Sequence, residues 1–236
     1  MDKYSILKQY YGHSAFRAGQ EALIDAILSG RDALCVMPTG GGKSLCYQIP
    51  ALLLPSITLV VSPLISLMKD QVAALKSAGV PAAYINSSLT GEQIRTVYAR
   101  TRKGAYKLIY VAPERLETNS FLSLMQEMDV SFLAVDEAHC ISQWGQDFRP
   151  SYLGIVDFIN ALPHRPIVAA YTATATKQVQ SDILRLLQLQ SPYRIVTGFD
   201  RPNLYFDVRR PKNKFSALAA LIDERRGRGG RGPRAK

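Results

Sequence analysis

Apolar runs alternate with segments of helical periodicity along most of this chain. Several of the runs are continuous in Val, Ile, Leu and Ala, which is typical of parallel strands buried on both faces. The pattern predicts an α/β protein with a mostly parallel sheet. The predicted strands are Ala33–Met37, Ile57–Ser62, Ala82–Ile85, Lys107–Ala112, Phe132–Asp136, Ile167–Thr172 and Arg194–Thr197.

Helix signals lie between these strands. Thr90-Gly91-Glu92-Gln93 forms a capping box that predicts the start of a helix running towards Arg102. Helices between parallel strands cover both faces of the sheet, and such sheets bind ligands at the carboxyl ends of their strands. Further helices are predicted at Gln20–Leu28, from Leu64 to a stop at Gly79, and around Ile183–Leu189.

The alternation of strands and helices stops near Gly198, which predicts a domain over residues 1–198. Residues 199–222 are interpreted as a linker and the start of a further, truncated domain, with a lone strand at Leu204–Val208. Residues 223–236 are rich in Arg and Gly and cannot bury a core, so they predict a disordered basic tail.

The composition narrows the class of protein. The net charge of +10 favours a polyanionic partner, although six of the basic residues lie in the last twelve positions and weaken that argument. Three widely spaced cysteines make neither a disulfide framework nor a zinc site. No apolar run approaches the roughly 20 residues that cross a bilayer, and no signal-peptide pattern begins the chain, so a cytoplasmic protein without a membrane partner is expected.

The most informative stretch is Met37-Pro38-Thr39-Gly40-Gly41-Gly42-Lys43-Ser44, between an apolar run and a helical segment. A glycine-rich turn at a helix start lets backbone N–H groups converge on a phosphate. Met37 stands where the strict motif has glycine, and a flexible turn with a chance Gly-Lys-Ser is the alternative. The flanking strand and helix favour nucleotide binding by Thr39, Gly40, Gly41, Gly42 and Lys43, with the Ser44 hydroxyl as a Mg²⁺ ligand.

A second polar pair, Asp136-Glu137, follows the apolar run Phe132–Val135. A nucleoside triphosphatase needs a carboxylate at such a strand end for its metal. Asp136 is expected to hold Mg²⁺ and Glu137 to activate the attacking water, with Lys43 as the third candidate catalytic residue. A solvated turn is the alternative, and it is disfavoured by the upstream Gly42-Lys43-Ser44.

Together these stretches resemble the N-terminal motor domain of RecQ-type DNA helicases of superfamily two. The resemblance implies a RecA-like P-loop NTPase fold, ATP and Mg²⁺ as cofactors, and single-stranded and duplex DNA as partners. It also implies 3′-to-5′ helicase activity in DNA recombination and repair. Besides the two motifs above, it is carried by Phe16–Gln20, Val61–Gln71, Tyr110–Leu116, Tyr171–Thr176 and, most distinctively, the aromatic-rich stretch Ala138–Tyr152.

The resemblance assigns adenine recognition to the segment ahead of the phosphate loop. The Gln20 amide can donate to and accept from an adenine edge, and the Arg17 guanidinium can pack near the base or pair with a phosphate. His13 stands where many relatives carry a stacking tyrosine.

DNA contacts are expected from residues that offer stacking faces or hydrogen-bond donors. Base–aromatic stacking tolerates any sequence, which suits a translocating motor, although a structural Trp144 is the alternative. The resemblance also assigns coupling between hydrolysis and motion to His139, Thr172 and Thr174. The candidate DNA-binding residues are Ser62, Lys69, Arg115, Gln143, Trp144, Phe148 and Arg149.

Related motors use two lobes, and the second supplies arginines to the γ-phosphate. Asp200–Val208 resembles the start of that lobe, after which the chain becomes rich in Arg and Gly. The chain is therefore expected to be an incomplete motor that needs a second lobe. Two alternatives remain open: a catalytically inactive nucleic-acid-binding fragment, and an RNA-directed relative, which the aromatic-rich stretch disfavours.

Overall fold

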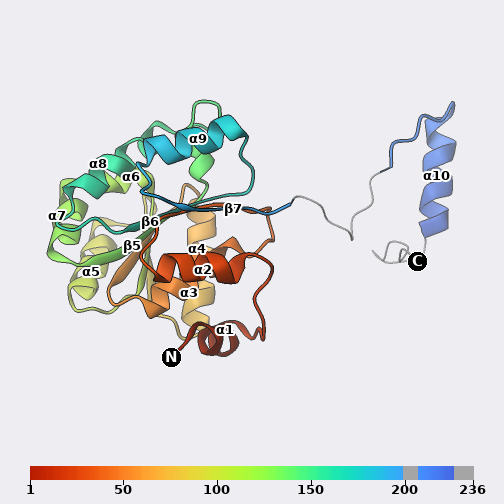
Figure 1. Ribbon diagram of the computed structural model, residues 1–236. Helices are drawn as coiled ribbons and strands as arrows, with labels where there is room; N and C mark the ends of the chain where they lie inside the picture. Colours follow the sequence, from red (N-terminus) through yellow and green to blue (C-terminus); the bar gives the residue numbers. More distant parts are fainter. Residues whose placement is uncertain (199–206, 226–236) are drawn as a thin grey trace. The chain divides into compact units, whose positions relative to one another are not determined.

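The computed structural model describes residues 1–198 and 207–225, and the chain divides into two compact units, Met1–Gly198 and Phe199–Lys236. The first unit is built on a seven-stranded sheet in which every pairing is parallel (Figure 1). The strand order is β3-β4-β2-β5-β6-β1-β7. The strands are β1 (Ala33–Val36), β2 (Ile57–Val61), β3 (Ala82–Ile85), β4 (Leu108–Val111), β5 (Val130–Val135), β6 (Ile167–Thr172) and β7 (Tyr193–Val196).

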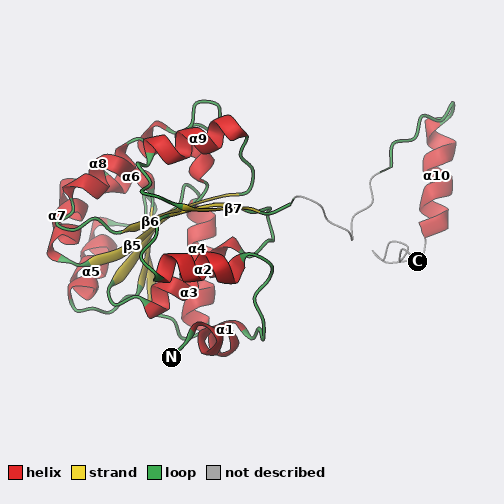
Figure 2. Cartoon of the chain, in the orientation of Figure 1, coloured by secondary structure: helices red, strands yellow, loops and turns green. Residues whose placement is uncertain are grey.

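Helices cover both faces of this sheet, as the continuous apolar strands predict (Figure 2). Alternate residues of the inner strands point to opposite cores: Leu133 packs with one set of helices and Phe132 with the other. The first set is α5 (Gly91–Arg102), α6 (Pro113–Leu116), α7 (Asn119–Glu127), α8 (Gly154–Ala161) and α9 (Lys177–Leu186). The second is α2 (Gln20–Leu28), α3 (Lys43–Leu53) and α4 (Ile65–Ser77), with α1 (Lys3–Tyr11) packed on α3.

The predicted α/β class, the parallel sheet and the location of all seven strands are confirmed, with strand ends shifted by at most two residues. The capping box at Thr90 is also confirmed, because its hydroxyl accepts from the Gln93 N–H and the Gln93 side chain accepts from the Thr90 N–H. Within the first unit, the sequence pattern missed α1, α6, α7 and α8. The cysteines Cys35, Cys46 and Cys140 are buried and unpaired, in agreement with the absence of a disulfide framework.

The second unit contains α10 (Lys214–Arg225). This helix continues to Arg225, three residues beyond residue 222, where the sequence places the start of the tail. The strand expected at Leu204–Val208 falls mostly outside the described residues, and its last two residues are not in a strand. The remainder of the basic tail also lies outside them. No helix within the two described ranges is long and apolar enough to cross a bilayer.

A buried ion pair joins the amino ends of three strands, on the edge of the sheet opposite the phosphate loop. Asp32, which precedes β1, is 3% exposed and accepts two hydrogen bonds from Arg165, at 3.1 and 2.6 Å. Its carboxylate also accepts from the backbone N–H groups of Val168 in β6 (2.9 Å) and Gln190 ahead of β7 (2.7 Å). All of these donors lose their partner together if the carboxylate is removed.

We therefore predict that Asp32→Ala lowers the free energy of unfolding by about 2–4 kcal/mol, because two backbone N–H groups are left without an acceptor and the partly exposed Arg165 loses its ion-pair partner. Urea denaturation followed by circular dichroism measures the loss. The matched control is Glu127→Ala, which removes the solvent-exposed partner of Arg102 and is expected to leave the transition almost unchanged. Equal effects of the two substitutions would contradict the assignment.

Candidate functional site

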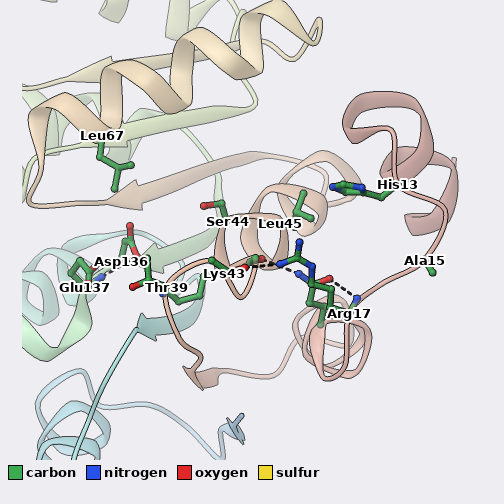
Figure 3. A pocket seen from close by; sticks show the side chains of 13 residues that line it. His13, Ala15, Arg17, Thr39, Lys43, Ser44, Leu45, Leu67, Asp136 and Glu137 are labelled. Carbon is green, nitrogen blue, oxygen red and sulfur yellow. Dashed lines mark hydrogen bonds between the residues drawn. The ribbon is translucent and has the colours of Figure 1, made fainter. Parts of the chain in front are cut away.

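The phosphate loop and the acidic pair face one cavity at the carboxyl edge of the sheet (Figure 3). Its volume is about 440 Å³. The strand order explains the meeting, because β6 alone separates β1, which leads into the loop, from β5, which ends at the acidic pair. The cavity is lined by His13, Ala15, Arg17, Gln20, Thr39, Gly40, Gly42, Lys43, Ser44, Leu45, Leu67, Asp136 and Glu137.

Most predicted nucleotide-binding residues therefore line this cavity, and Gly41 does not. The Gly41 N–H donates to Pro38 O within the loop (2.9 Å), so it holds the turn in shape. Gly42 has φ +85°, so a side chain there would be strained, and its β-carbon, 2.2 Å from Gln20 Nε2, would displace the Gln20 amide. The Lys43 ammonium donates to Met37 O (3.0 Å) and extends towards the acidic pair.

Gln20 has a different position from the one its expected role implies. Its side chain is buried, with Nε2 donating to Gly42 O (3.1 Å) and Oε1 accepting from the Arg17 N–H (2.8 Å). Arg17 in turn donates to Gly40 O (2.5 Å). In this conformation the two side chains support the phosphate loop, and contact with a base requires Gln20 to exchange its partners.

The two carboxylates differ in their environments. Burial, with a smaller contribution from Glu137, raises the pKa of Asp136 to about 6. The hydrogen bond from His139 lowers the pKa of Glu137, which keeps that carboxylate ionised. Glu137 has φ +47°, a backbone conformation that non-glycine residues rarely adopt. The backbone of the preceding residue is held by the Tyr152 hydroxyl, which donates to the carbonyl of Asp136 (2.9 Å). The site therefore places Asp136, whose ionised form is disfavoured, next to Glu137, whose ionised form is stabilised.

The predicted coupling residues form a continuous hydrogen-bonded chain. The Thr172 hydroxyl donates to Thr174 O (3.0 Å), so its oxygen accepts from His139 Nδ1 (3.0 Å). The same ring nitrogen lies 3.3 Å from Glu137 Oε2. Contacts with Cys140 and with Glu137 raise the pKa of His139 to about 10, so both ring nitrogens of the imidazole carry a proton at neutral pH. These contacts connect the end of β6 to the Glu137 carboxylate.

The aromatic-rich stretch begins next to these hydrogen-bonded residues, and its tryptophan is exposed to solvent. Trp144 is 75% exposed, which excludes a structural core role. The Gly145 position accepts no side chain, since a β-carbon would lie 2.2 Å from His139 O. Arg149 donates to Asp147 (2.7 Å) and to Pro63 O (3.2 Å), so the stretch is fastened to the segment that follows β2.

The remaining predicted DNA contacts differ in accessibility. Lys69 and Gln143 are exposed, whereas Phe148 and Arg115 are partly buried, with Arg115 donating to Asn86 O (3.4 Å). Ser62 is only 1% exposed, and among the described residues its hydroxyl has no hydrogen-bond partner. In this conformation the Ser62 side chain faces the protein interior, so a direct contact with DNA would require the side chain to become exposed.

Some residues of the site were not expected from the sequence. Leu67, in α4, lies over the Asp136 side of the cavity, and Leu45 lines it from α3 (Figure 3). Ser142 donates to Asp182 of α9 (2.7 Å) and accepts from the Trp144 N–H (3.2 Å). The contact of Tyr152 with the Asp136 carbonyl was also not expected, although Tyr152 belongs to the aromatic-rich stretch that the sequence analysis singled out.

Comparisons with known proteins agree with this geometry. Residues 17–182 match the sequence model of the DEAD/DEAH box helicase family. The chain therefore belongs to that family. It is 48% identical over 223 residues to ATP-dependent DNA helicase RecQ of Bacillus subtilis. This alignment covers 94% of this chain and 38% of the relative. RecQ of Haemophilus influenzae is also 48% identical, over 96% of this chain and 36% of its own length.

Solved structures share the fold at low sequence identity. The DUF1998 helicase MrfA aligns with a TM-score of 0.69 and 17% identity, over 96% of this chain and 37% of that chain. The helicase domain of Pyrococcus furiosus Hef aligns with a TM-score of 0.59 and 21% identity, over 76% of this chain and 38% of that chain. The RecA-like helicase fold is thus confirmed. The chain spans between a third and two fifths of the length of its RecQ relatives.

We predict that Asp136→Asn stabilises the protein when nucleotide and divalent metal are absent. The raised pKa means that the ionised carboxylate opposes folding, and this penalty grows as the pH rises from about 4 through 6. The variant is expected to gain up to about 3 kcal/mol at pH 7.5, with about half of the gain left at pH 5. Urea unfolding in EDTA at both pH values measures it. A gain that does not depend on pH would contradict burial of the Asp136 charge as the cause.

Proposed function

We propose that this chain is the ATP-binding lobe of a RecQ-like 3′-to-5′ DNA helicase, which couples ATP hydrolysis to DNA strand separation. The observation that carries the proposal is the single cavity in which Lys43, Ser44, Asp136 and Glu137 meet. The family match over residues 17–182 supports the same function.

The donor set fits a nucleotide-bound Mg²⁺. Within the described residues no group of three or more His, Cys, Asp or Glu side chains forms a metal cage. Mg²⁺ usually keeps several waters and takes one or two protein ligands plus phosphate oxygens, so Ser44 and Asp136 suffice. When bound, the ion would neutralise charge on the phosphates. A lowered pKa for Asp136 in that state follows from the nearby positive charge.

The chain's own groups then have separate tasks. The loop N–H groups and the Lys43 ammonium bind the phosphates, for which Lys43 exchanges its bond to Met37 O. Glu137, ionised and held by His139, orients the attacking water and accepts its proton. Arg17 and His13 lie at the end of the cavity away from the acidic pair, where the base is proposed to bind.

We also propose that single-stranded DNA binds along Lys69 and the aromatic-rich stretch, and that a second motor lobe completes the γ-phosphate site. The exposure of Trp144 and its attachment to the segment after β2 support the first part. The greater length of the RecQ relatives supports the second. The chain alone is therefore expected to turn over ATP slowly and to unwind a 3′-tailed duplex hardly at all.

The catalytic assignment predicts that Glu137→Gln lowers ATP hydrolysis by about 100-fold or more while ATP binding is retained, because a general base is lost and the phosphate contacts remain. Phosphate release measures turnover, and a fluorescent N-methylanthraniloyl ATP measures affinity. Lys43→Ala is the contrasting variant and should weaken binding itself. If wild-type protein binds the nucleotide without any turnover, the inactive-fragment alternative is correct instead.

The DNA assignment predicts that Trp144→Ala weakens binding of a labelled oligo-dT by about 5- to 150-fold, the loss of one stacked base. Trp144→Phe, which keeps a stacking face, is the matched control and should retain most of the affinity. Fluorescence anisotropy gives both values, and competition with oligo-U tests the RNA-directed alternative. Unchanged oligo-dT affinity in Trp144→Ala would remove this residue from the DNA site.

A further inference from the structure

Two of the motif stretches, Val61–Gln71 and Tyr110–Leu116, meet helix α3 in a polar cluster. Gln48 of α3 donates through Nε2 to Gln71 Oε1 of α4 (2.9 Å) and to the Tyr110 hydroxyl of β4 (3.0 Å). Gln48 and Tyr110 are 4% and 2% exposed, so the bond between them is shielded from water, whereas Gln71 is partly buried. We call these residues, together with Tyr47, the glutamine–tyrosine cluster.

One end of the cluster reaches the candidate metal ligand. The buried Tyr47 hydroxyl is hydrogen-bonded to Ser44 and to Tyr110, and the Tyr47 and Tyr110 rings meet edge to face with centroids 6.3 Å apart. Ser44, Tyr47 and Gln48 share one face of α3, since they are three and four residues apart. Burial raises the pKa of Tyr110 to about 12, so the hydroxyl stays neutral and available as a hydrogen-bond partner.

The other end reaches the elements that carry the proposed DNA contacts. Gln71 lies in α4, which also presents Lys69 to solvent and Leu67 to the nucleotide cavity. Tyr110 lies in β4, which leads into the short helix that holds Arg115. The cluster thus hydrogen-bonds both DNA-facing elements to the helix that begins at the phosphate loop.

We infer that Gln48 is a positioning residue that transmits DNA binding to the phosphate loop, through α4 and β4 on one side and Ser44 on the other. This inference rests on the proposed function and adds a route separate from the His139 chain. Both hydrogens of the Gln48 amide are engaged, and leaving buried polar groups unpaired is costly, so a displacement of α4 must move α3 or break the cluster. Coupling of two sites through such an element changes each ligand's affinity by the same factor.

The test measures that factor in the complete 236-residue chain. The dissociation constant of N-methylanthraniloyl ATP with Mg²⁺ is determined with and without saturating oligo-dT. The wild-type ratio is expected to differ from one by about 5-fold or more, in either direction. In Gln48→Leu the ratio falls below about 2-fold, while each ligand alone binds within about 2-fold of wild type, because neither is contacted by Gln48.

Two further variants separate positioning from mere packing. Tyr110→Phe removes only the hydroxyl and should give an intermediate ratio. Ile49→Val, at the neighbouring buried position of α3, trims the core without touching the cluster and should keep the wild-type ratio. The inference is overturned if Gln48→Leu keeps the same ratio as the wild type, or if the wild-type protein itself gives a ratio of one. In either case, nucleotide binding by the wild-type chain still upholds the proposed function. Absence of nucleotide binding in the wild-type chain overturns both.

Discussion

The site depends on the parallel pairing of β1, β6, β5 and β2. Their hydrogen-bond ladder continues past the strand ends: the Met37 N–H donates to Thr172 O (3.0 Å) and the Asp136 N–H to Val61 O (2.9 Å). These bonds fix the phosphate loop, the β6 end and the acidic pair relative to one another. A one-residue slip of any of these strands would turn its side chains to the other face and remove its contribution to the cavity.

Next to these strand ends, the protein holds two carboxylate residues in unfavourable settings. Asp136 is kept in a setting that disfavours its charge, and Glu137 is kept in a rarely populated backbone conformation. Both features are offset by the surrounding core, whose strands are almost completely buried on both faces. Local strain at a functional site is thus compensated by well-packed elements elsewhere, which is a stability–activity trade-off.

Sequence reasoning succeeded where a physical pattern is local. Continuous apolar runs identified the sheet, and the glycine-rich turn with the acidic pair identified the residues that meet in the cavity. It missed α8, although Ile155, Phe158 and Ile159 recur at helical spacing, because the segment is short and follows a loop rich in aromatic residues.

What the sequence did not reveal depends on tertiary contacts. Ser62 continues an apolar strand, and nothing local shows that its hydroxyl turns inward. The engagement of the Gln20 amide with the phosphate loop requires knowledge of the loop's path. The partners of Gln48 are 23 and 62 residues away, so no spacing rule connects them.

The burial of every cysteine has a practical consequence. Cys35, Cys46 and Cys140 are enclosed in the two cores that flank the sheet, and burial raises the pKa of Cys35 to about 12. Thiolates are the reactive form, so the native thiols resist alkylation while the protein is folded. A cysteine introduced on an exposed helix face can therefore carry a spectroscopic label without removal of the native three.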